Sequence, residues 1–176
     1  MLLIKAGTVH DGNGNIFENT DILIKNGIIE AIGNSIDIPE NVEIYDAKGK
    51  VVFPGFIDSL NVWGAKGPGW EDDDLSELSD PVTPQMDVVY SFDQDSMYFQ
   101  RVFEYGVTSA GLAPSTSNVL GGYMAVFKTY GDHPYKMLVK DKVGQVASIS
   151  SKTKIAYGKR NICPMTKMGA VSLQKT

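Results

Sequence analysis

The stretch PGFIDSLNVWG, residues 54–64, marks the point where the pattern of the sequence changes. Its residues 56–60 open with an apolar pair and are typical of a strand buried on both faces, as strands of parallel sheets are. Asp58 is expected to cap or anchor this strand. The stretch therefore predicts that a parallel sheet begins here, and it divides the chain into residues 1–53 and residues 54–176.

The residues before this stretch alternate between apolar and polar side chains, with turn signals in between. Asn26-Gly27 separates two such runs and predicts a β-hairpin over residues 21–33, because both central residues of a type I′ turn need positive φ. Further strands are expected at residues 42–45 and 51–52, with a turn at residues 48–50. This first part is thus predicted to form a small antiparallel β unit.

A long polar segment, residues 63–91, follows the expected strand. Loops of this length are usually functional lids or disordered segments. Asp93 or Asp95 can then cap a helix that ends at Gly106. The apolar face of this helix would consist of Met97, Phe99, Val102, Phe103 and Tyr105. Residues 107–112 are expected to form the next strand, and the order strand, helix, strand implies a parallel βαβ unit.

The last third of the chain holds three further expected elements. Strands are expected at residues 123–128 and 136–139, and a helix over residues 166–175 begins after Pro164.

Charge and cysteine content exclude several classes of protein and partner. With 16 basic and 21 acidic residues the net charge is −5, which argues against nucleic acid and anionic membranes as partners. The single cysteine, Cys163, excludes a disulfide scaffold and fits a reducing compartment. We expect no secretory leader at the start of the sequence, and no apolar run reaches the ~20 residues of a membrane span. The sequence predicts a cytoplasmic globular protein.

Several motifs occur in one order along nearly the whole chain. The first part contains IKAGTVHDGNGN, DILIKNGIIEAIG and IPENVEIYDAKGKVVFPGFID, and the later part contains DPVTPQ, FEYGVTSAGLAPSTSNVLGGYMAVFKTYG and YGKRNICPMTKMG. In this combination the chain resembles the amidohydrolase superfamily, which comprises metal-dependent hydrolases of cyclic amides, amidines and related carbon–nitrogen bonds. Within that superfamily it resembles an imidazolonepropionase-related branch.

The resemblance implies a β-sandwich built from both chain ends and a (β/α)₈ barrel that begins with the PGFID strand. In such enzymes a His-x-His pair after that strand binds zinc or a similar ion, and the ion lowers the pKa of its bound water to ~7. The fold class predicted here is α/β. It comprises an N-terminal antiparallel β-sandwich portion, residues 1–53, followed by the first part of a (β/α) barrel-like parallel sheet, residues 54–176.

In this sequence the two histidine positions are occupied by Leu60 and Val62. Neither side chain has a lone pair to donate, so this half of a metal site cannot form. Asn61, between them, should point to the opposite face of the strand. The chain has two histidines, His10 and His133, which fall in turns and have no ligand spacing. We therefore predict no metal, no cofactor and no catalytic residue in this chain.

The length of the chain supports the same prediction. An eight-stranded barrel takes roughly 250 residues, or at least ~200, and the whole chain has 176. A partial parallel sheet leaves an open edge and an uncovered apolar face. Three outcomes are open: a self-contained smaller fold, a homo-oligomer that pairs the open edges, or a second chain that supplies the missing barrel strands.

The strongest candidate for a binding site is the loop PSTSNVLGG, residues 114–122. It follows the expected strand at residues 107–112, and barrel enzymes place their sites at the ends of such strands. Its hydroxyls, amide and glycine N–H groups can bind a polar ligand. The alternative is a rigid turn kept for its backbone shape. The predicted ligand-binding residues are Ser115, Ser117, Asn118, Gly121 and Gly122.

Two other features favour plain structural interpretations. The acidic run Glu71-Asp72-Asp73-Asp74 lacks the spacing of a calcium loop and predicts a solvated loop. Cys163 has Lys159 and Arg160 nearby, which would favour a thiolate. It has no evident base beside it, so an inert thiol is expected.

These observations predict an amidohydrolase-family protein, nominally a hydrolase of non-peptide carbon–nitrogen bonds, whose short chain is metal-free and inactive alone. It would be a pseudoenzyme, a truncated gene product or one part of a split enzyme. The alternative is a non-catalytic ligand-binding or scaffolding module that uses the loop at residues 114–122 or its open sheet edges.

Overall fold

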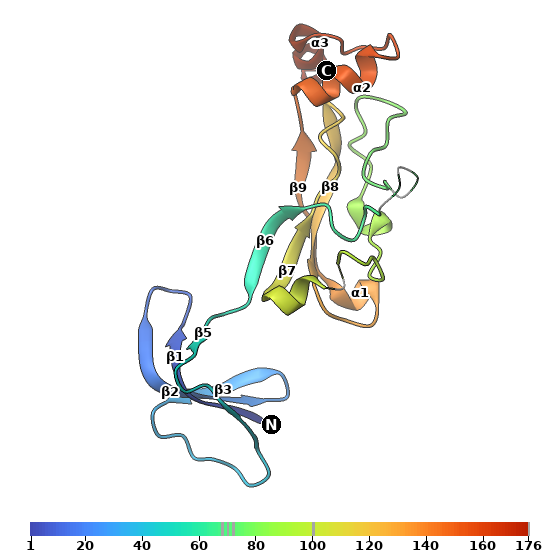
Figure 1. Ribbon diagram of the computed structural model, residues 1–176. Helices are drawn as coiled ribbons and strands as arrows, with labels where there is room; N and C mark the ends of the chain where they lie inside the picture. The colour runs from blue at the N-terminus through green and yellow to red at the C-terminus, as the bar shows by residue number, and fades with distance from the viewer. Residues whose placement is uncertain (68, 70, 72, 100, 176) are drawn as a thin grey trace. The chain divides into compact units, whose positions relative to one another are not determined.

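The computed structural model describes residues 1–175 except positions 68, 70, 72 and 100. The chain divides into two compact units, Met1–Pro54 and Gly55–Thr176, and each unit has its own sheet (Figure 1). The two sheets and the few short helices confirm the predicted α/β class.

The N-terminal unit is one five-stranded sheet. The predicted hairpin is confirmed, because Asn26 and Gly27, with φ of 53° and 77°, form the turn between its second and third strands. The strands are β1 (Leu2–His10), β2 (Ile16–Lys25), β3 (Ile28–Gly33), β4 (Glu43–Asp46) and β5 (Val51–Val52). Their order is β3-β2-β1-β4, with β5 also paired to β1.

The direction of the last two strands differs from the prediction. β4 and β5 both run parallel to β1, with Leu3 opposite Ile44 and Thr8 opposite Val51. The prediction of a wholly antiparallel unit is therefore wrong. The turn expected at residues 48–50 does not reverse the chain, since β4 and β5 lie one after the other along the same neighbour.

The C-terminal unit is built on a four-stranded sheet of order β6-β7-β8-β9. Its strands are β6 (Phe56–Asn61), β7 (Val107–Leu112), β8 (Leu120–Lys128) and β9 (Leu138–Ala147). β6 and β7 are parallel, as predicted, whereas β7, β8 and β9 pair antiparallel. The parallel part of the sheet is thus limited to β6 and β7. A parallel pair needs a crossover of about a dozen residues or more, whereas the short connections before and after β8 can join only antiparallel neighbours.

The helices of this unit are short. They are η1 (Val88–Ser91), η2 (Val102–Tyr105), α1 (Pro134–Met137), α2 (Ser151–Gly158) and α3 (Lys167–Gln174), where η marks a 3₁₀ helix. The predicted C-terminal helix is confirmed as α3, in which the Thr166 hydroxyl accepts the Gly169 N–H at 3.1 Å. No helix in the described part of the chain has the length and apolar character needed to cross a membrane.

The prediction of a strand at residues 136–139 is wrong for its first two residues. Lys136 and Met137 belong to α1, and β9 begins at Leu138. The ring of His133 accepts the Tyr135 N–H at 3.3 Å, and Pro134 occupies the first helical position, where proline is favoured. These two residues start a helical turn before the strand begins.

The helix expected between Asp93 and Tyr105 does not form as predicted. The chain instead makes successive i→i+3 turns, such as Phe99 N–H to the Ser96 carbonyl and Val102 N–H to the Phe99 carbonyl, which lead into η2. Gly106, at φ 83°, ends η2 as expected. Packing explains the difference, since Phe99 is buried edge-on against Phe92 at a centroid distance of 5.0 Å.

The core of the C-terminal unit lies between this connecting segment and the sheet. Phe92 stacks on Phe127 of β8 with ring centroids 3.9 Å apart. The buried cluster consists of Ala65, Leu75, Val88, Phe92, Phe99, Ala110, Leu112, Ala125, Phe127 and Met137. The connection between β6 and β7 therefore provides much of the layer that covers one face of β7 and β8.

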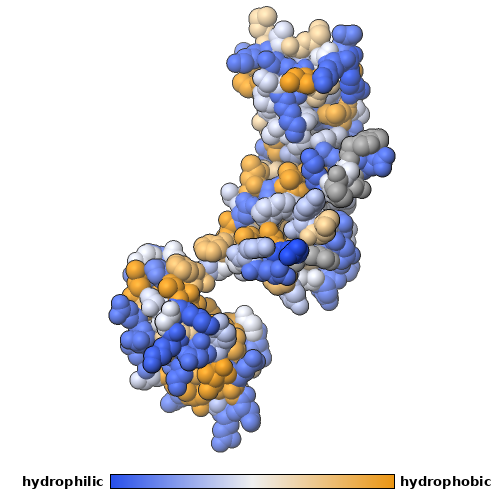
Figure 2. Space-filling view, viewed as in Figure 1, coloured by the Kyte–Doolittle hydropathy of each residue, from blue (hydrophilic) through white to orange (hydrophobic). Residues whose placement is uncertain are grey.

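β6 does not have the burial that its sequence predicts. Phe56, Ile57 and Leu60 are 57%, 71% and 63% exposed, and within the described residues β6 pairs only with β7. Figure 2 shows apolar surface around this strand. The prediction of a strand buried on both faces is thus wrong for this chain, because such a strand needs a second neighbour and a covering layer on each face.

This exposure predicts a contrast between two leucines on neighbouring strands. Leu60→Ala should lower the free energy of unfolding by less than about 0.5 kcal/mol, as expected for an exposed side chain. Leu112→Ala, in the buried cluster, should lower it by about 2–5 kcal/mol. Urea unfolding followed by circular dichroism measures both. A cost for Leu60→Ala close to that of Leu112→Ala would show that β6 is covered in solution.

Candidate functional site

The predicted binding loop borders a pocket at the carboxyl end of β7. The pocket has a volume of about 390 Å³. Its wall includes Ser115, Asn118, Gly121 and Gly122, four of the five predicted residues. The full lining is Asp74, Leu75, Ser76, Glu77, Thr83, Gln85, Met86, Asp87, Val88, Tyr90, Ser91, Pro114, Ser115, Asn118, Gly121 and Gly122. The structure thus brings the predicted loop together with the polar segment between β6 and β7.

Asn118 is the most heavily bonded of these residues. Its Nδ2 donates to the Glu77 carbonyl at 2.8 Å and to Thr83 Oγ1 at 2.7 Å, while its Oδ1 accepts the Tyr157 hydroxyl at 2.7 Å. The side chain is only 5% exposed. Asn118 therefore joins the loop to α2 and to residues 77–83, and it forms a rigid floor under the pocket.

Tyr157 completes this connection from α2. Its hydroxyl also contacts the Asp80 carbonyl at 2.7 Å, and its side chain is fully buried. Burial raises the pKa of Tyr157 to about 12; the charges of Asp80 and Glu77 act in the same direction, and that of Arg160 acts against it. The phenol is therefore a neutral hydrogen-bonding group at every physiological pH.

Ser115 and Ser117 form a second small network. Their hydroxyl oxygens lie 2.7 Å apart, the Ser117 N–H donates to Ser115 Oγ at 3.2 Å, and Lys152 Nζ donates to the same oxygen at 3.0 Å. Ser117 is buried behind Ser115. Thr153 Oγ1 donates to the Thr116 carbonyl at 2.9 Å, so α2 holds this end of the loop as well.

The two predicted glycines differ in what they allow. A Cβ on Gly122 would lie 2.4 Å from the Met86 carbonyl oxygen, whereas a Cβ on Gly121 would meet its nearest atom at 3.5 Å. The backbone of residues 86–87 lies against β8 at Gly122, and the Tyr123 N–H donates to the Met86 carbonyl at 2.9 Å. Gly122 therefore serves the close approach of two backbones.

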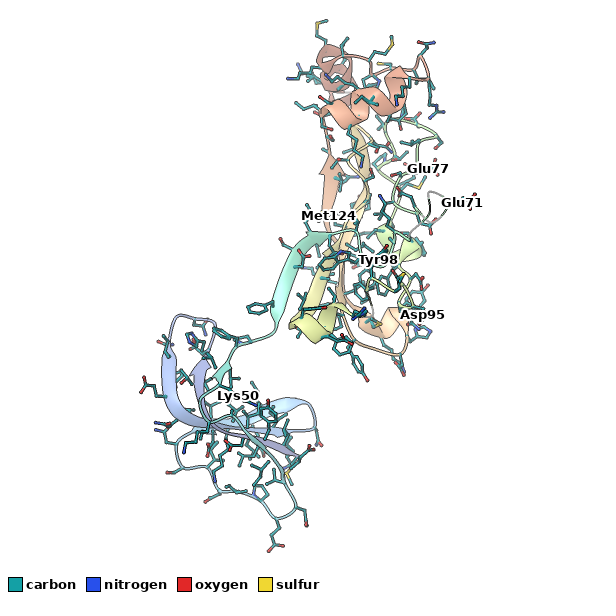
Figure 3. All side chains as sticks on the ribbon, in the orientation of Figure 1. Lys50, Glu71, Glu77, Asp95, Tyr98 and Met124 are labelled. Atoms are coloured by element: carbon teal, nitrogen blue, oxygen red, sulfur yellow. The ribbon has the colours of Figure 1, made fainter. Side chains whose placement is uncertain are left out.

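Acidic side chains from the segment between β6 and β7 form the opposite wall. Asp74, Glu77 and Asp87 all line the pocket, and in Figure 3 Glu77 projects from the segment that runs beside β8. Hydrogen bonds from Ser79 lower the pKa of Glu77, and Asp87 Oδ1 caps η1 by accepting the Val89 N–H at 3.0 Å. The sequence indicated a lid or a disordered loop for this segment and a solvated acidic run that includes Asp74, but it did not single out Glu77, Asp87 or Tyr90.

The positions that the resemblance links to metal binding lie at the end of β6, and none of them lines the pocket. Leu60 and Val62 are exposed, while Asn61 between them is buried, as the predicted alternation requires. Asn61 Oδ1 accepts the Trp63 N–H at 3.0 Å, and its buried Nδ2 has no partner among the described residues. Aliphatic groups and an amide N–H cannot ligate a cation, so these residues do not fit the metal that the resemblance implies. Asp58 Oδ1 accepts the Leu60 N–H at 3.3 Å and so anchors the strand.

The two histidines lie in structural positions. His10 stacks on Phe53 with ring centroids 4.5 Å apart, and His133 caps α1. In the part of the chain that the structure describes, no three His, Cys, Asp or Glu side chains come together as a metal site would require.

The acidic run at residues 71–74 and Cys163 were the other features considered in the sequence. Asp73, of the acidic run, accepts the Leu75 N–H at 3.1 Å and lies 3.8 Å from Lys66 Nζ, while Asp72 lies outside the described residues. Cys163 is exposed.

Comparison with known proteins identifies the fold. The chain superposes on the crystal structure of an amidohydrolase from Thermotoga maritima with a TM-score of 0.90 and 32% identity, over 98% of this chain. The chain belongs to the amidohydrolase superfamily. No protein-family profile matches it, but two curated relatives agree with the structural match. An amidohydrolase of Hapsidospora irregularis is 29% identical over 168 residues, and a dihydroorotase of Aquifex aeolicus is 49% identical over 57 residues.

This amidohydrolase-superfamily chain is much shorter than those proteins. It spans 17% of the Hapsidospora amidohydrolase, 13% of the Aquifex dihydroorotase and 45% of the Thermotoga structure. The predicted superfamily is confirmed, and the imidazolonepropionase-related branch stays a prediction.

The buried phenol predicts an alkaline limit to stability. Because the pKa of Tyr157 is raised from 10.0 to about 12 in the folded chain, its contribution is complete below pH 10 and is lost as the pH rises toward 12. Tyr157→Phe should lower the free energy of unfolding at pH 7 by about 1–3 kcal/mol, since the Asn118 amide loses its partner. The loss between pH 10 and 12 should be smaller in this variant than in the parent.

Urea unfolding at several pH values measures both effects. Tyr130→Phe is the matched control, because Tyr130 is exposed. This replacement should leave the loss in free energy of unfolding between pH 10 and 12 as it is in the parent. If the parent and Tyr157→Phe lost the same free energy of unfolding between pH 10 and 12, the alkaline loss would not come from the Tyr157 phenol.

The two glycines of β8 offer a paired test of the loop geometry. Gly122→Ala should lower the free energy of unfolding by about 1–3 kcal/mol, because the new methyl group overlaps the Met86 carbonyl. Gly121→Ala should be close to neutral. Thermal and urea unfolding of the two variants provide the measurement, and equal stability would show that β8 and residues 86–87 are not in close contact.

Proposed function

We propose that this chain is an amidohydrolase-superfamily protein that does not bind a catalytic metal ion and does not hydrolyse carbon–nitrogen bonds by itself. The observation that carries the proposal is the pair Leu60 and Val62 at the positions where the resemblance implies two metal-binding histidines. These two aliphatic side chains offer no lone pair to a metal ion. Without the ion, water in this site keeps its ordinary pKa and is a poor nucleophile at neutral pH.

We further propose that the exposed strand β6 is completed by a second chain of the same fold family. Two observations support this. Ile57 and Leu60 are 71% and 63% exposed on β6, which among the described residues pairs with β7 alone, and such edges are sites of pairing. The chain also matches 45% of the Thermotoga amidohydrolase at a TM-score of 0.90, so a complementary portion of that fold exists in relatives. Hydrolysis, if it occurs, then belongs to the completed assembly.

The compartment proposed for this protein is the cytoplasm. The support is one exposed cysteine, Cys163, which fits a reducing environment.

A second candidate function is ligand binding without catalysis. The pocket of about 390 Å³ at the carboxyl end of β7 favours it, since ligand sites in parallel sheets lie at this end of the strands. The floor formed by Asn118 and Thr83 is rigid and satisfied by its own hydrogen bonds, so a ligand would meet a preformed surface.

Metal analysis with an activity assay tests the first proposal. The purified chain, incubated with zinc and desalted, should retain well below one ion per chain and should not hydrolyse a panel of cyclic amides. The variant Leu60→His/Val62→His should gain zinc affinity, because two imidazoles on alternate positions of one strand face the same side. It should remain inactive, since further ligands are missing.

The outcomes separate the alternatives. One tightly held zinc ion in the unmodified chain, or turnover that a chelator abolishes, would contradict the proposal. Native mass spectrometry then distinguishes the partner: a homodimer that dissociates on Ile57→Asp would favour self-association over a second chain.

A further inference from the structure

Many of the basic residues of the C-terminal unit are concentrated in one segment. Residues 142–176 contain seven lysine and arginine residues and no aspartate or glutamate. The segment includes α2 and α3, which lie at the same end of the unit (Figure 1). The net charge of −5, which argues against an anionic partner for the chain as a whole, therefore conceals a strongly positive region.

Several of these cations are available to a partner. Lys159, Lys167 and Lys175 are exposed, and among the described residues none of them forms an ion pair. Arg160, at the end of α2, donates instead to the Leu78 carbonyl in the segment between β6 and β7. It is thus the α2 side of this region that meets the acidic segment, and the lysines of α3 keep their charge uncompensated.

Apolar side chains stand among these cations. Met168 of α3 is 80% exposed, and Met165, just before the helix, is 58% exposed. Figure 2 shows apolar groups among hydrophilic ones at this end of the unit. A shallow depression on α3 is lined by Lys167, Met168, Val171, Ser172 and Lys175. These five residues form the α3 face, on which two lysines flank two apolar side chains.

The composition of this region separates three kinds of anionic partner. Single-stranded nucleic acid binds on aromatic stacking platforms, but Tyr157, the aromatic residue of the segment, is fully buried. Protein interfaces are depleted of lysine and enriched in arginine and aromatic residues, whereas this segment has six lysines and one arginine. Clustered lysines beside exposed aliphatic side chains are typical of surfaces that bind anionic lipids.

We propose that the α3 face docks on an anionic lipid bilayer. The ammonium groups of Lys167 and Lys175 bind the negative headgroups, and their aliphatic stems lie along the apolar boundary below. Met168 and Val171 enter that boundary between them. The attachment is peripheral, because no helix in the described part of the chain has the length and apolar character needed to cross a membrane.

The acidic segment between β6 and β7 limits the orientation. Residues 67–100 contain nine acidic residues and no basic one. In Figure 3, Glu71, Glu77 and Asp95 project from the side of the unit rather than from the end that carries α3. Screening limits the reach of these charges to about 10 Å at 0.1 M salt, so the charges nearest to the bilayer decide. The chain should therefore approach with its α3 end.

Vesicle co-sedimentation of the full chain tests the proposal. Vesicles of phosphatidylcholine alone are compared with vesicles in which about one third of the lipid is phosphatidylserine. The chain should bind the anionic vesicles at least about tenfold more tightly, and raising the salt concentration should weaken this binding. Equal binding to both kinds of vesicle, or binding to neither, would overturn the proposal.

Paired lysine substitutions assign the binding to the α3 face. Lys167→Gln/Lys175→Gln should weaken binding to the anionic vesicles at least about tenfold. Lys25→Gln/Lys48→Gln removes the same charge from exposed positions of the N-terminal unit and should have no effect. If the two double variants weaken binding equally, the charge of the whole chain and not the α3 face is responsible, and the proposal is wrong.

A second pair of variants separates a bilayer from other polyanions. Met168→Ser should weaken binding to the anionic vesicles about threefold to tenfold, because less apolar area enters the boundary. Ile28→Ser, at a position of the N-terminal unit that is 71% exposed, is the matched control. If Met168→Ser binds as the parent does and duplex DNA displaces the vesicles, the surface recognises charge alone and the bilayer assignment is wrong.

The single cysteine provides a local probe of the contact. Cys163 is exposed, and its Sγ lies 3.3 Å from where a Cβ on Gly169 of α3 would be. An environment-sensitive fluorophore attached to Cys163 should shift its emission to shorter wavelength with the anionic vesicles and not with phosphatidylcholine. The same fluorophore on Cys163→Ser/Asn13→Cys, in an exposed loop of the N-terminal unit, should not shift. A shift at Asn13→Cys alone would show that another surface meets the lipid.

Discussion

The pairing of β6 with β7 is the constraint on which the C-terminal unit depends. β6 carries apolar side chains on both faces, yet within the described residues it has one neighbouring strand. Burying a large aliphatic or aromatic side chain is worth about 1.5–3 kcal/mol, so Phe56, Ile57 and Leu60 together represent a substantial gain for any partner that covers them. The residues of β6 are typical of a strand in the interior of a parallel sheet. This explains why the sequence predicts a buried strand, although β6 is exposed in this chain.

Local signals in the sequence predicted local structure well, and long-range contacts decided the rest. The turn at Asn26-Gly27, the stop at Gly106 and the helix start after Pro164 are each set by backbone sterics or by one hydrogen bond, so a few neighbouring residues suffice to predict them. The directions of β4 and β5 depend instead on pairing with β1, which no local signal encodes. The expected helix before Gly106 failed for the same reason, because Phe99 packs against Phe92 and the core rather than along one helical face.

The candidate site was predictable only on its loop side. Ser115, Asn118 and Gly122 stand out because small polar residues and glycines follow a strand, but their partners lie far away in the sequence. Asn118 bonds Thr83, 35 residues before it, and Tyr157, 39 residues after it. Glu77 and Asp87 belong to a segment whose polar composition is equally typical of a lid or of disorder. Only the fold shows that this segment lies along β8 and lines the pocket.

The positions that the resemblance links to metal binding and the pocket at the carboxyl end of β7 are separate features of the C-terminal unit. Leu60 lies on the edge strand β6 and Val62 follows directly after its end, and neither belongs to the buried cluster. The pocket is held by β7, β8, α2 and the connecting segment, through hydrogen bonds that are satisfied among themselves. The side chains at positions 60 and 62 therefore take no part in the hydrogen-bond network of the pocket. The rigid, negatively charged cavity depends on contacts among β7, β8, α2 and the connecting segment, and it does not depend on which residues occupy these two positions.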